Sequence, residues 1–334
     1  MTSQNGGGFR LNVLSPGGRD PDQDFANDSN SASHAPVNFH AYAASTRGSF
    51  LRTVERAIEA QRPVLLLIRG DFRDSEKALV RLKEAGVPVA VSLKEIGLHQ
   101  IADQLRDARK LDRFIRIVSE ADGCIAPTSE AAEIFRSFCG SDKAVAFIPT
   151  PYPTQDPQWD FSRAPNERNG IFVGTREWDV LSRNHLAALV LARELSNETG
   201  ATVTAYDFAG RSGKRLLDQL GFAPDKLRVL TERRGYANYL RVLAEHRIVL
   251  QLDSSFVPGQ VAGDALLCRV PCVGGNGAID RIGHPQTCGW NRRIDELRTV
   301  ALKLLREPQS VEAPDAVSFE TGARALADYF NSLG

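Results

Sequence analysis

Residues 250–255 read Leu-Gln-Leu-Asp-Ser-Ser, residues 258–259 are Pro-Gly, and residues 264–275 read Asp-Ala-Leu-Leu-Cys-Arg-Val-Pro-Cys-Val-Gly-Gly. This pattern predicts a buried strand that ends in small polar residues, a glycine-containing loop, a short helix that opens with a carboxylate, and a second strand that runs into glycines. Loop amides and the positive end of a helix suit phosphates, and an acidic side chain suits the hydroxyls of a ribose. The segment therefore predicts a site for a phosphorylated, ribose-bearing ligand.

The composition is that of a soluble globular protein of about two domains, with 334 residues, 42% hydrophobic and 25% charged. Lysine plus arginine equals aspartate plus glutamate, 41 of each. No overall field attracts nucleic acid, which we exclude as a partner, whereas peripheral contact with a membrane stays open. Apolar runs such as 64–68 are too short for a transmembrane segment, and the polar, glycine-rich residues 1–8 carry no secretory signal. We expect a cytoplasmic protein.

Neither the cysteines nor the histidines show ligand spacing. The five cysteines form an odd set without a C-x-x-C pair, which argues against a disulfide framework or a zinc knuckle. Two of them, four positions apart on an apolar segment, are expected to be buried thiols. None of the six histidines pairs with another at ligand spacing, so we expect no metal centre. The cysteines are Cys124, Cys139, Cys268, Cys272 and Cys288.

In both halves of the chain, short apolar segments alternate with segments of helical periodicity. Strands are expected over 11–14, 64–68, 87–91, 123–126 and 144–148, and then over 170–173, 202–207, 227–230, 248–252 and 272–273. Helices are expected over 49–60, 75–85, 101–119 and 129–138, and then over 184–199, 214–220, 236–245, 263–268, 295–306 and 319–333. The stretch 20–33 is rich in Asp, Asn and Ser and predicts a mobile loop within a partly flexible region 10–36.

Continuous apolar strands that alternate with amphipathic helices predict parallel sheets covered on both faces. The fold class expected is α/β, with two Rossmann-like, doubly wound domains that face a central cleft. The first domain is expected over 1–155 and the second over 170–316, with a proline- and aspartate-rich hinge at 156–169 and a C-terminal helix, 317–334, that returns to the first domain.

Several local sequences carry a family resemblance. Residues 121–130 (Ala-Asp-Gly-Cys-Ile-Ala-Pro-Thr-Ser-Glu), 147–151 (Phe-Ile-Pro-Thr-Pro) and 172–174 (Phe-Val-Gly), together with 264–273, resemble nucleotide-sugar glycosyltransferases of the GT-B fold. The similarity is greatest to their large retaining group, the family 4-like enzymes, and extends from about 63 to 278. It implies a hexosyltransferase that uses a nucleotide-diphosphate sugar without a metal or cofactor, as in polysaccharide biosynthesis. The acceptor, a glycan, lipid or small molecule, would bind in the cleft on the side of the first domain.

The resemblance also assigns the donor site. Asp264 stands where the family has the second of two glutamates and would bind the ribose, and Gly259 and Gly263 belong to the expected phosphate-binding turn and helix start. Arg176 and Arg183 follow the first strand of the second domain and would face the diphosphate, unless they are solvated surface arginines.

Two further positions of the second domain are covered by the resemblance. Phe256 occupies the position of the first glutamate, and a phenylalanine cannot perform the polar role of a carboxylate. Arg233 and Arg234 lie where the backbone of the family holds the nucleobase.

In the first domain, Lys94 and Glu95 follow a strand where the family often has His-Asp. We interpret them as catalytic, one orienting the substrate and one acting as a base, with a surface ion pair at a helix start as the alternative. Gly17 and Gly18 match the acceptor-side loop, or else form a simple turn.

Three functions remain open at this level. The first is glycosyl transfer. The second is non-catalytic binding of a nucleotide or glycan as a partner protein, which Phe256 favours. The third is a different α/β enzyme, such as a nucleotide-sugar epimerase, because a fold does not determine the chemistry.

Overall fold

The structure is a computed structural model that describes residues 8–26, 35–140 and 143–333. Residues 27–34 of the expected mobile loop therefore lie outside the described residues. The chain divides into two compact units, which are described separately: unit 1 comprises Met1–Pro153 and Ala316–Gly334, and unit 2 comprises Thr154–Asp315. Two α/β units built on parallel sheets confirm the predicted fold class.

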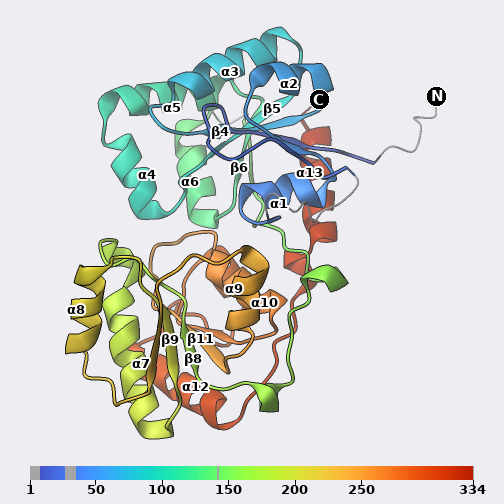
Figure 1. The fold of residues 1–334 in the computed structure, drawn as a ribbon. Coiled ribbons are helices and arrows are strands. Elements are labelled where there is room, and N and C mark those ends of the chain that lie inside the picture. Colours follow the sequence, from blue (N-terminus) through green and yellow to red (C-terminus); the bar gives the residue numbers. More distant parts are fainter. Residues whose placement is uncertain (1–7, 27–34, 141–142, 334) are drawn as a thin grey trace. The chain divides into compact units, whose positions relative to one another are not determined.

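Unit 1 contains a seven-stranded sheet in the order β2-β3-β1-β4-β5-β6-β7 (Figure 1). All neighbouring strands are parallel except β2 and β3, so the expected parallel sheet carries one antiparallel edge strand. The strands are β1 (Asn12–Leu14), β2 (Gln23–Asp24), β3 (Ser49–Leu51), β4 (Val64–Ile68), β5 (Val89–Leu93), β6 (Gly123–Ala126) and β7 (Ala144–Phe147).

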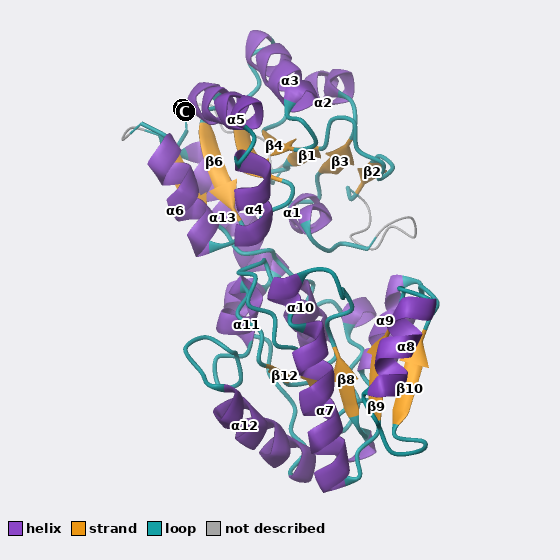
Figure 2. Cartoon of the chain, turned by 90° about the vertical axis from the view of Figure 1, so that its left-hand side faces the viewer, coloured by secondary structure: helices purple, strands orange, loops and turns teal. Residues whose placement is uncertain are grey.

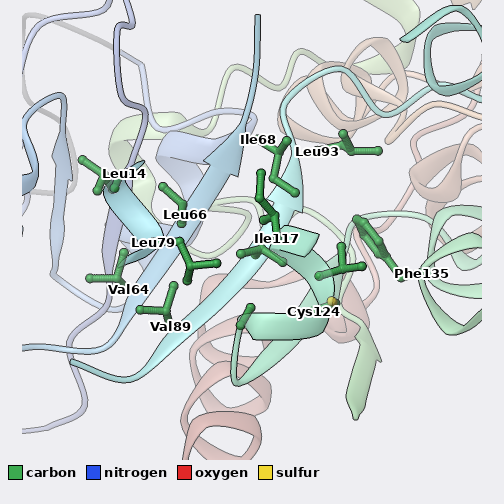
Figure 3. Packing of buried hydrophobic residues seen from close by; sticks show 14 of the residues in the cluster. Leu14, Val64, Leu66, Ile68, Leu79, Val89, Leu93, Ile117, Cys124 and Phe135 are labelled. Carbon is green, nitrogen blue, oxygen red and sulfur yellow. The ribbon is translucent and has the colours of Figure 1, made fainter. Parts of the chain in front are cut away.

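Helices cover both faces of this sheet. On one face, α2, α3, α5 and α6 pack on alternate strand residues such as Leu66 and Val91, in the core drawn in Figure 3. On the other face, α1 and α13 pack on Val13, Leu65 and Ala90. The helices are α1 (Phe39–Ser45), α2 (Val54–Ala60), α3 (Arg73–Glu84), α4 (Leu98–Leu105), α5 (Ala108–Glu120), α6 (Ser129–Phe138) and α13 (Phe319–Asn331).

Unit 2 contains a five-stranded parallel sheet in the order β10-β9-β8-β11-β12. The strands are β8 (Ile171–Val173), β9 (Val203–Tyr206), β10 (Leu227–Leu230), β11 (Ile248–Leu250) and β12 (Cys272–Val273). The α-helices are α7 (His185–Thr199), α8 (Arg211–Gln219), α9 (Tyr236–Leu243), α10 (Gln260–Leu267), α11 (Ala278–Gly283) and α12 (Ile294–Arg306).

The two faces of the second sheet are also covered by different helices. Figure 2 shows α7 and α12 near one face, and both contribute to the core that contains Ile171, Val203 and Leu250. On the opposite face, Phe172 packs against Tyr239 of α9, with 5.9 Å between the ring centroids. Strands β8, β9 and β11 are therefore buried on both sides, as their apolar sequences predict, whereas the edge strand β10 carries exposed residues.

The segment 156–169, expected to be a hinge, belongs to unit 2. Arg168 is buried and its guanidinium donates to the carbonyl oxygens of Arg163 (2.6 Å), Arg269 (2.7 Å) and Gln309 (3.2 Å). These bonds hold the segment against distant parts of the unit, and the unit boundary falls at Pro153–Thr154.

Two expected helices of unit 1 were wrong in extent. The expected helix 49–60 consists of β3 followed by α2, because Ser49, Phe50 and Leu51 pair in register with the residues of β1. The apolar spacing across the two elements imitates a helical period. The expected helix 101–119 is divided into α4 and α5 at Asp107, whose side chain accepts a hydrogen bond from the amide of Lys110 and caps α5.

Besides β3, one further strand and two α-helices were not expected from the sequence. These are β2, within the polar stretch 20–33, and the short helices α1 and α11. Helix α1 carries Phe39 and Tyr42, which are buried in the core of unit 1 together with Phe50.

A first prediction concerns the attachment of α13 to the sheet. The Tyr329 hydroxyl lies 3.1 Å from the carbonyl oxygen of Cys124 and 3.0 Å from that of Ala144. We expect Tyr329→Phe to lower the free energy of unfolding by about 1–2 kcal/mol, because buried acceptors lose their donor. Urea unfolding at pH 7 measures this loss.

The matched control is Tyr206→Phe. The buried Tyr206 hydroxyl has no hydrogen-bond partner among the described residues, so its removal should leave the free energy of unfolding within about 0.5 kcal/mol. Equal losses in the two variants would show that the Tyr329 hydroxyl contributes nothing specific.

Candidate functional site

The carboxyl ends of β8 and β11 define the point where a ligand is expected in unit 2. The chain proceeds from β8 to β9 and β10 on one side, and then returns to β11 on the other side of β8. In open α/β sheets, ligands bind outside the carboxyl ends of strands at such a reversal. The loops concerned are 174–184, after β8, and 251–259, after β11.

Helix α10 lies against this edge. A Cβ atom on Gly174, directly after β8, would lie 2.5 Å from a methyl carbon of Val261, so glycine permits the close approach of helix and strand. Gly259 precedes the helix with a φ of 93°, a left-handed conformation that favours glycine. The helix begins at Gln260, earlier than the expected 263, and Gly263 is buried within it.

Arg183 organises the two loops. Its guanidinium forms an ion pair with Asp253, which is almost fully buried and also accepts a hydrogen bond from the amide of Ser255 (2.8 Å). The neighbouring Asn184 donates to the carbonyl oxygen of Leu252 (2.9 Å). Arg183 therefore ties the loop after β8 to the loop after β11, and its charge is already compensated.

Arg176 is more exposed, with 53% of its side chain accessible. Its guanidinium carbon lies 5.8 Å from the centre of the Phe208 ring, and that of Arg233 lies 5.7 Å from the same ring. Its Nε is 3.6 Å from the exposed carboxylate of Glu177. Loops after β8, β9 and β10 thus bring two arginines to one aromatic side chain at the carboxyl edge of the sheet.

Asp264 is buried in the second turn of α10 rather than opening the helix. Its carboxylate accepts a hydrogen bond from the hydroxyl of Tyr236 (2.5 Å) and another from Tyr239. Burial raises the pKa of Asp264 to about 7, whereas these bonds and the charge of Arg176 act in the opposite direction. Tyr236 in turn packs on Trp159, at 5.5 Å between ring centroids.

A second buried carboxylate, Asp280 of α11, had no signal in the sequence. It accepts a hydrogen bond from the side chain of Gln251 (2.8 Å), and a Cβ atom on Gly259 would lie 3.0 Å from its other oxygen. Burial, together with the charge of Asp253, raises the pKa of Asp280 to about 7. The start of α10 therefore has an ionisable acid beside it.

Phe256 has a left-handed backbone, with a φ of 52°, and its amide donates to the side chain of Asn276 (3.1 Å). Its ring meets Trp290 edge to face, with 5.5 Å between centroids, and the guanidinium carbon of Arg281 lies 5.1 Å from the centre of Trp290. An aromatic cluster thus occupies the position where the resemblance places a glutamate.

In unit 1 the corresponding reversal lies between β1 and β4. Gly17 and Gly18 form the turn directly after β1, and the Gly18 amide donates to the carbonyl oxygen of Ser15 (3.0 Å). Arg69, directly after β4, reaches this turn: a Cβ atom on Gly18 would lie 3.0 Å from its guanidinium. Sequence reasoning missed Arg69.

Lys94 and Glu95 directly follow β5 at the same edge of the first sheet. The Lys94 ammonium lies 5.7 Å from the centre of the Phe39 ring. The exposed carboxylate of Glu95 accepts a hydrogen bond from Gln100 (3.0 Å), in α4. Lys94 therefore contacts Phe39 of α1, whereas Glu95 contacts Gln100 of α4.

Other features of the described residues bear on ligands. A cavity of about 440 Å³ opens at the amino edge of the second sheet, lined by Thr202, Arg228 and His246 among others, away from the strand ends where ligands are expected.

Within residues 8–26, 35–140 and 143–333, no three His, Cys, Asp or Glu side chains gather as metal ligands. No helix in these ranges is long and apolar enough to cross a bilayer.

Comparison with known proteins gives structural matches alone. No protein-family model matches the chain, and no curated protein matches it. Anabaena HepE in complex with UDP-glucose is 11% identical, with a TM-score of 0.58 over 97% of this chain and 99% of that one. Burkholderia multivorans α,α-trehalose 6-phosphate synthase is 9% identical, with a TM-score of 0.55 over 97% and 95%.

A Listeria monocytogenes protein assigned as a UDP-N-acetylglucosamine 2-epimerase is 15% identical, with a TM-score of 0.52 over 84% of this chain and 77% of that one. Likeness at these identities shows the fold, which is that of the GT-B proteins expected from the sequence resemblance.

The buried titratable groups of unit 2 predict how stability depends on pH. Burial lowers the pKa of His185, His246 and His284 to about 4, so acid destabilises the folded state between about pH 6.5 and 4. The raised pKa values of Asp264 and Asp280 have the opposite sign: their contribution is complete in acid and is lost as the pH rises through about 7.

We therefore expect maximal stability near pH 6.5 and only a shallow decline from there to pH 8, because the loss from the two aspartates is largely offset as the histidines of the unfolded chain give up their remaining protons. Urea unfolding between pH 5 and 8 measures this profile. The variant Asp280→Asn removes one of the two falling contributions, so its stability should no longer decline above about pH 6.5. The exposed Asp225→Asn serves as a control for the substitution itself. A decline above pH 6.5 in Asp280→Asn equal to that of the unchanged protein would contradict the assignment.

Proposed function

We propose that the protein is a glycosyltransferase that moves a sugar, a hexose by resemblance, from a nucleotide-diphosphate sugar to an acceptor. The observation that carries the proposal is the carboxyl edge of the second sheet, where Arg176 and the start of α10 lie at the strand reversal. The GT-B fold supports it, since HepE has that fold and binds UDP-glucose. No metal or cofactor is part of the proposal.

The donor diphosphate would bind between Arg176 and the amides at the start of α10, with Gly259 and Gly263 allowing the turn and close packing. Departure of a nucleoside diphosphate develops negative charge, which a guanidinium and a helix N-terminus stabilise. Arg183 would act indirectly, because its ion pair with Asp253 holds both loops in position. Asp280 lies beside the start of α10, and its carboxyl group repels the diphosphate least when it is protonated.

Asp264 and Tyr236 form the polar pair proposed to face the pentose. The buried carboxylate is already bonded to the tyrosine hydroxyl, so the hydroxyl would meet the ribose or give way to it. The acceptor, a glycan, lipid or small molecule, would bind at the edge of unit 1 near Gly17 and Gly18. Transfer forms a bond from an acceptor oxygen to the anomeric carbon and releases the nucleoside diphosphate and one proton. We assign that proton to Glu95 and the orientation of the acceptor to Lys94.

The stereochemistry, the biological role and the location proposed for the enzyme rest on the sequence resemblance. Residues 264–273 resemble the retaining family 4-like group, which favours retention of configuration at the anomeric carbon. The same resemblance favours a role in polysaccharide biosynthesis and a cytoplasmic location. Proton NMR of the first product formed tests the stereochemistry.

Phe256 favours a second candidate, a binder of nucleotides or glycans that performs no transfer. Its ring packs with Trp290 and supplies no carboxylate to the donor sugar. Donor binding is common to both candidates, and turnover distinguishes them.

The binding prediction concerns Arg176. We expect Arg176→Ala to weaken the binding of UDP or GDP ten- to a hundredfold, because a charge-assisted hydrogen bond to phosphate contributes about 1.5–3 kcal/mol. Isothermal titration calorimetry measures the change. The control is Arg228→Ala, which removes an arginine at the opposite edge of the sheet and should leave the affinity unchanged. Equal affinities in both variants and the unchanged protein would exclude Arg176 from the diphosphate site.

The turnover prediction uses UDP-glucose, UDP-N-acetylglucosamine and GDP-mannose, each with water alone and with a panel of glycan, lipid and phosphorylated sugar acceptors. We expect release of nucleoside diphosphate that increases with one acceptor class and falls about a hundredfold or more in Glu95→Gln. Binding without release would select the non-catalytic candidate. Conversion of the nucleotide sugar without an acceptor would instead indicate an epimerase.

A further inference from the structure

Two cysteines of unit 1 lie next to each other. Cys124 is in β6 and Cys139 directly follows α6, and their sulfur atoms are 3.8 Å apart. Figure 3 shows the Cys124 sulfur on the side of the sheet that faces Phe135 of α6. A disulfide bond requires about 2.05 Å between the sulfurs, so a shift of less than about 2 Å would join them.

The topology explains this proximity. Helix α6 follows β6 after a short connection and is capped at its start by Thr128, whose side chain accepts from the amide of Ala131 (3.2 Å). The helix runs back along the sheet, so its last residues return to the beginning of the strand that precedes it. Cys124 is the second residue of β6, and Cys139 therefore meets it.

The two thiols differ in exposure and acidity. Cys124 is fully buried, whereas Cys139 is partly exposed. A hydrogen bond from the Cys124 thiol lowers the pKa of Cys139, and the charge of Lys143 adds to this effect. The same hydrogen bond, together with burial, raises the pKa of Cys124. Cys139 is thus the thiol that an oxidant can reach, and Cys124 is the partner beside it.

We propose that Cys124 and Cys139 are a modification site that forms a reversible intrachain disulfide when the protein meets a peroxide. The Cys139 sulfur attacks one peroxide oxygen, the O–O bond breaks, and a sulfenic acid forms. The Cys124 sulfur then attacks the Cys139 sulfur and displaces hydroxide. In total, two thiols and one hydrogen peroxide give one disulfide and two waters, with the sulfurs oxidised and the peroxide reduced.

The remaining cysteines, all in unit 2, have other contacts. The sulfur of Cys268 donates to the carbonyl oxygen of Leu240 (3.3 Å), and that of Cys288 to Pro285 (3.7 Å). Cys272 accepts from the side chain of Gln251 (3.3 Å). These three thiols are buried, and oxidation should reach them later than Cys139.

The bond would fasten the end of α6 to the start of β6. It would link two residues that are 15 positions apart in sequence and restrict the unfolded chain more than the folded one. The carbonyl oxygen of Cys124 is also held by Tyr329 of α13, so the strand itself need not move. The melting temperature of unit 1 should therefore rise by several degrees on oxidation.

The test uses the full chain treated with hydrogen peroxide in equimolar to tenfold amounts, then alkylated and digested with trypsin. Cleavage after Arg116, Arg136 and Lys143 places the two cysteines in separate peptides, 117–136 and 137–143. Mass spectrometry should find these peptides joined, two hydrogens lighter than their sum, and separated again by dithiothreitol. The melting temperature, followed before and after oxidation, should rise in parallel.

Three variants complete the design. Cys139→Ser should abolish both the joined peptides and the thermal shift, and Cys124→Ser should leave Cys139 as a stable sulfenic acid, trapped by dimedone. Cys288→Ser, a buried thiol outside the pair, should behave like the unchanged protein. Cys139 oxidised to sulfinic acid in the unchanged protein while Cys124 stays reduced would overturn the proposal, and so would a thermal shift that persists in Cys139→Ser.

Discussion

A parallel sheet must be covered on both faces, and the rest of this molecule follows from that constraint. Each parallel strand has to be followed by a crossover, which here is a helix in most cases, so all the parallel strands of a unit deliver their following loops to the same edge. In unit 2 this edge collects the loops after β8, β9, β10 and β11. The arginines near Phe208 and the ion pair of Arg183 with Asp253 are consequences of this convergence.

The start of α10 combines features that act in opposite directions. The helix N-terminus favours an anion, whereas Asp280 beside Gly259 and Asp264 in the next turn are acids. Their burial keeps the protonated form accessible near neutral pH, which reduces the conflict. Tyrosine hydroxyls and the amide of Gln251 satisfy the carboxylate oxygens in the meantime. The site is therefore filled by internal partners that a ligand could match or replace.

Much of the fold could be predicted from the sequence because the buried parallel strands are continuous apolar runs, such as 64–68, between amphipathic helices. The sequence did not predict helix α1 or the division of 49–60 into β3 and α2. These elements are short, and they are stabilised by contacts with distant residues rather than by a local hydrophobic period. The sequence predicted that Asp264 lies on a helix after β11 but placed it at the helix start, whereas it lies in the second turn of α10. Its burial beneath Tyr236 was not predictable, because that contact joins positions 28 apart in sequence. Asp280 and Arg69 carried no motif.

Arg168 attaches the first segment of unit 2 to the rest of the unit through hydrogen bonds to backbone carbonyls. Its guanidinium is held by backbone carbonyls, groups that neither gain nor lose protons and that carry no net charge. Ordinary ion pairs weaken when acid neutralises the carboxylate or when salt screens both charges. The hydrogen bonds from Arg168 to backbone carbonyls depend on neither effect. The segment around Arg168 should therefore stay attached to unit 2 at an acidic pH or a high salt concentration that weakens the surface ion pairs of the unit.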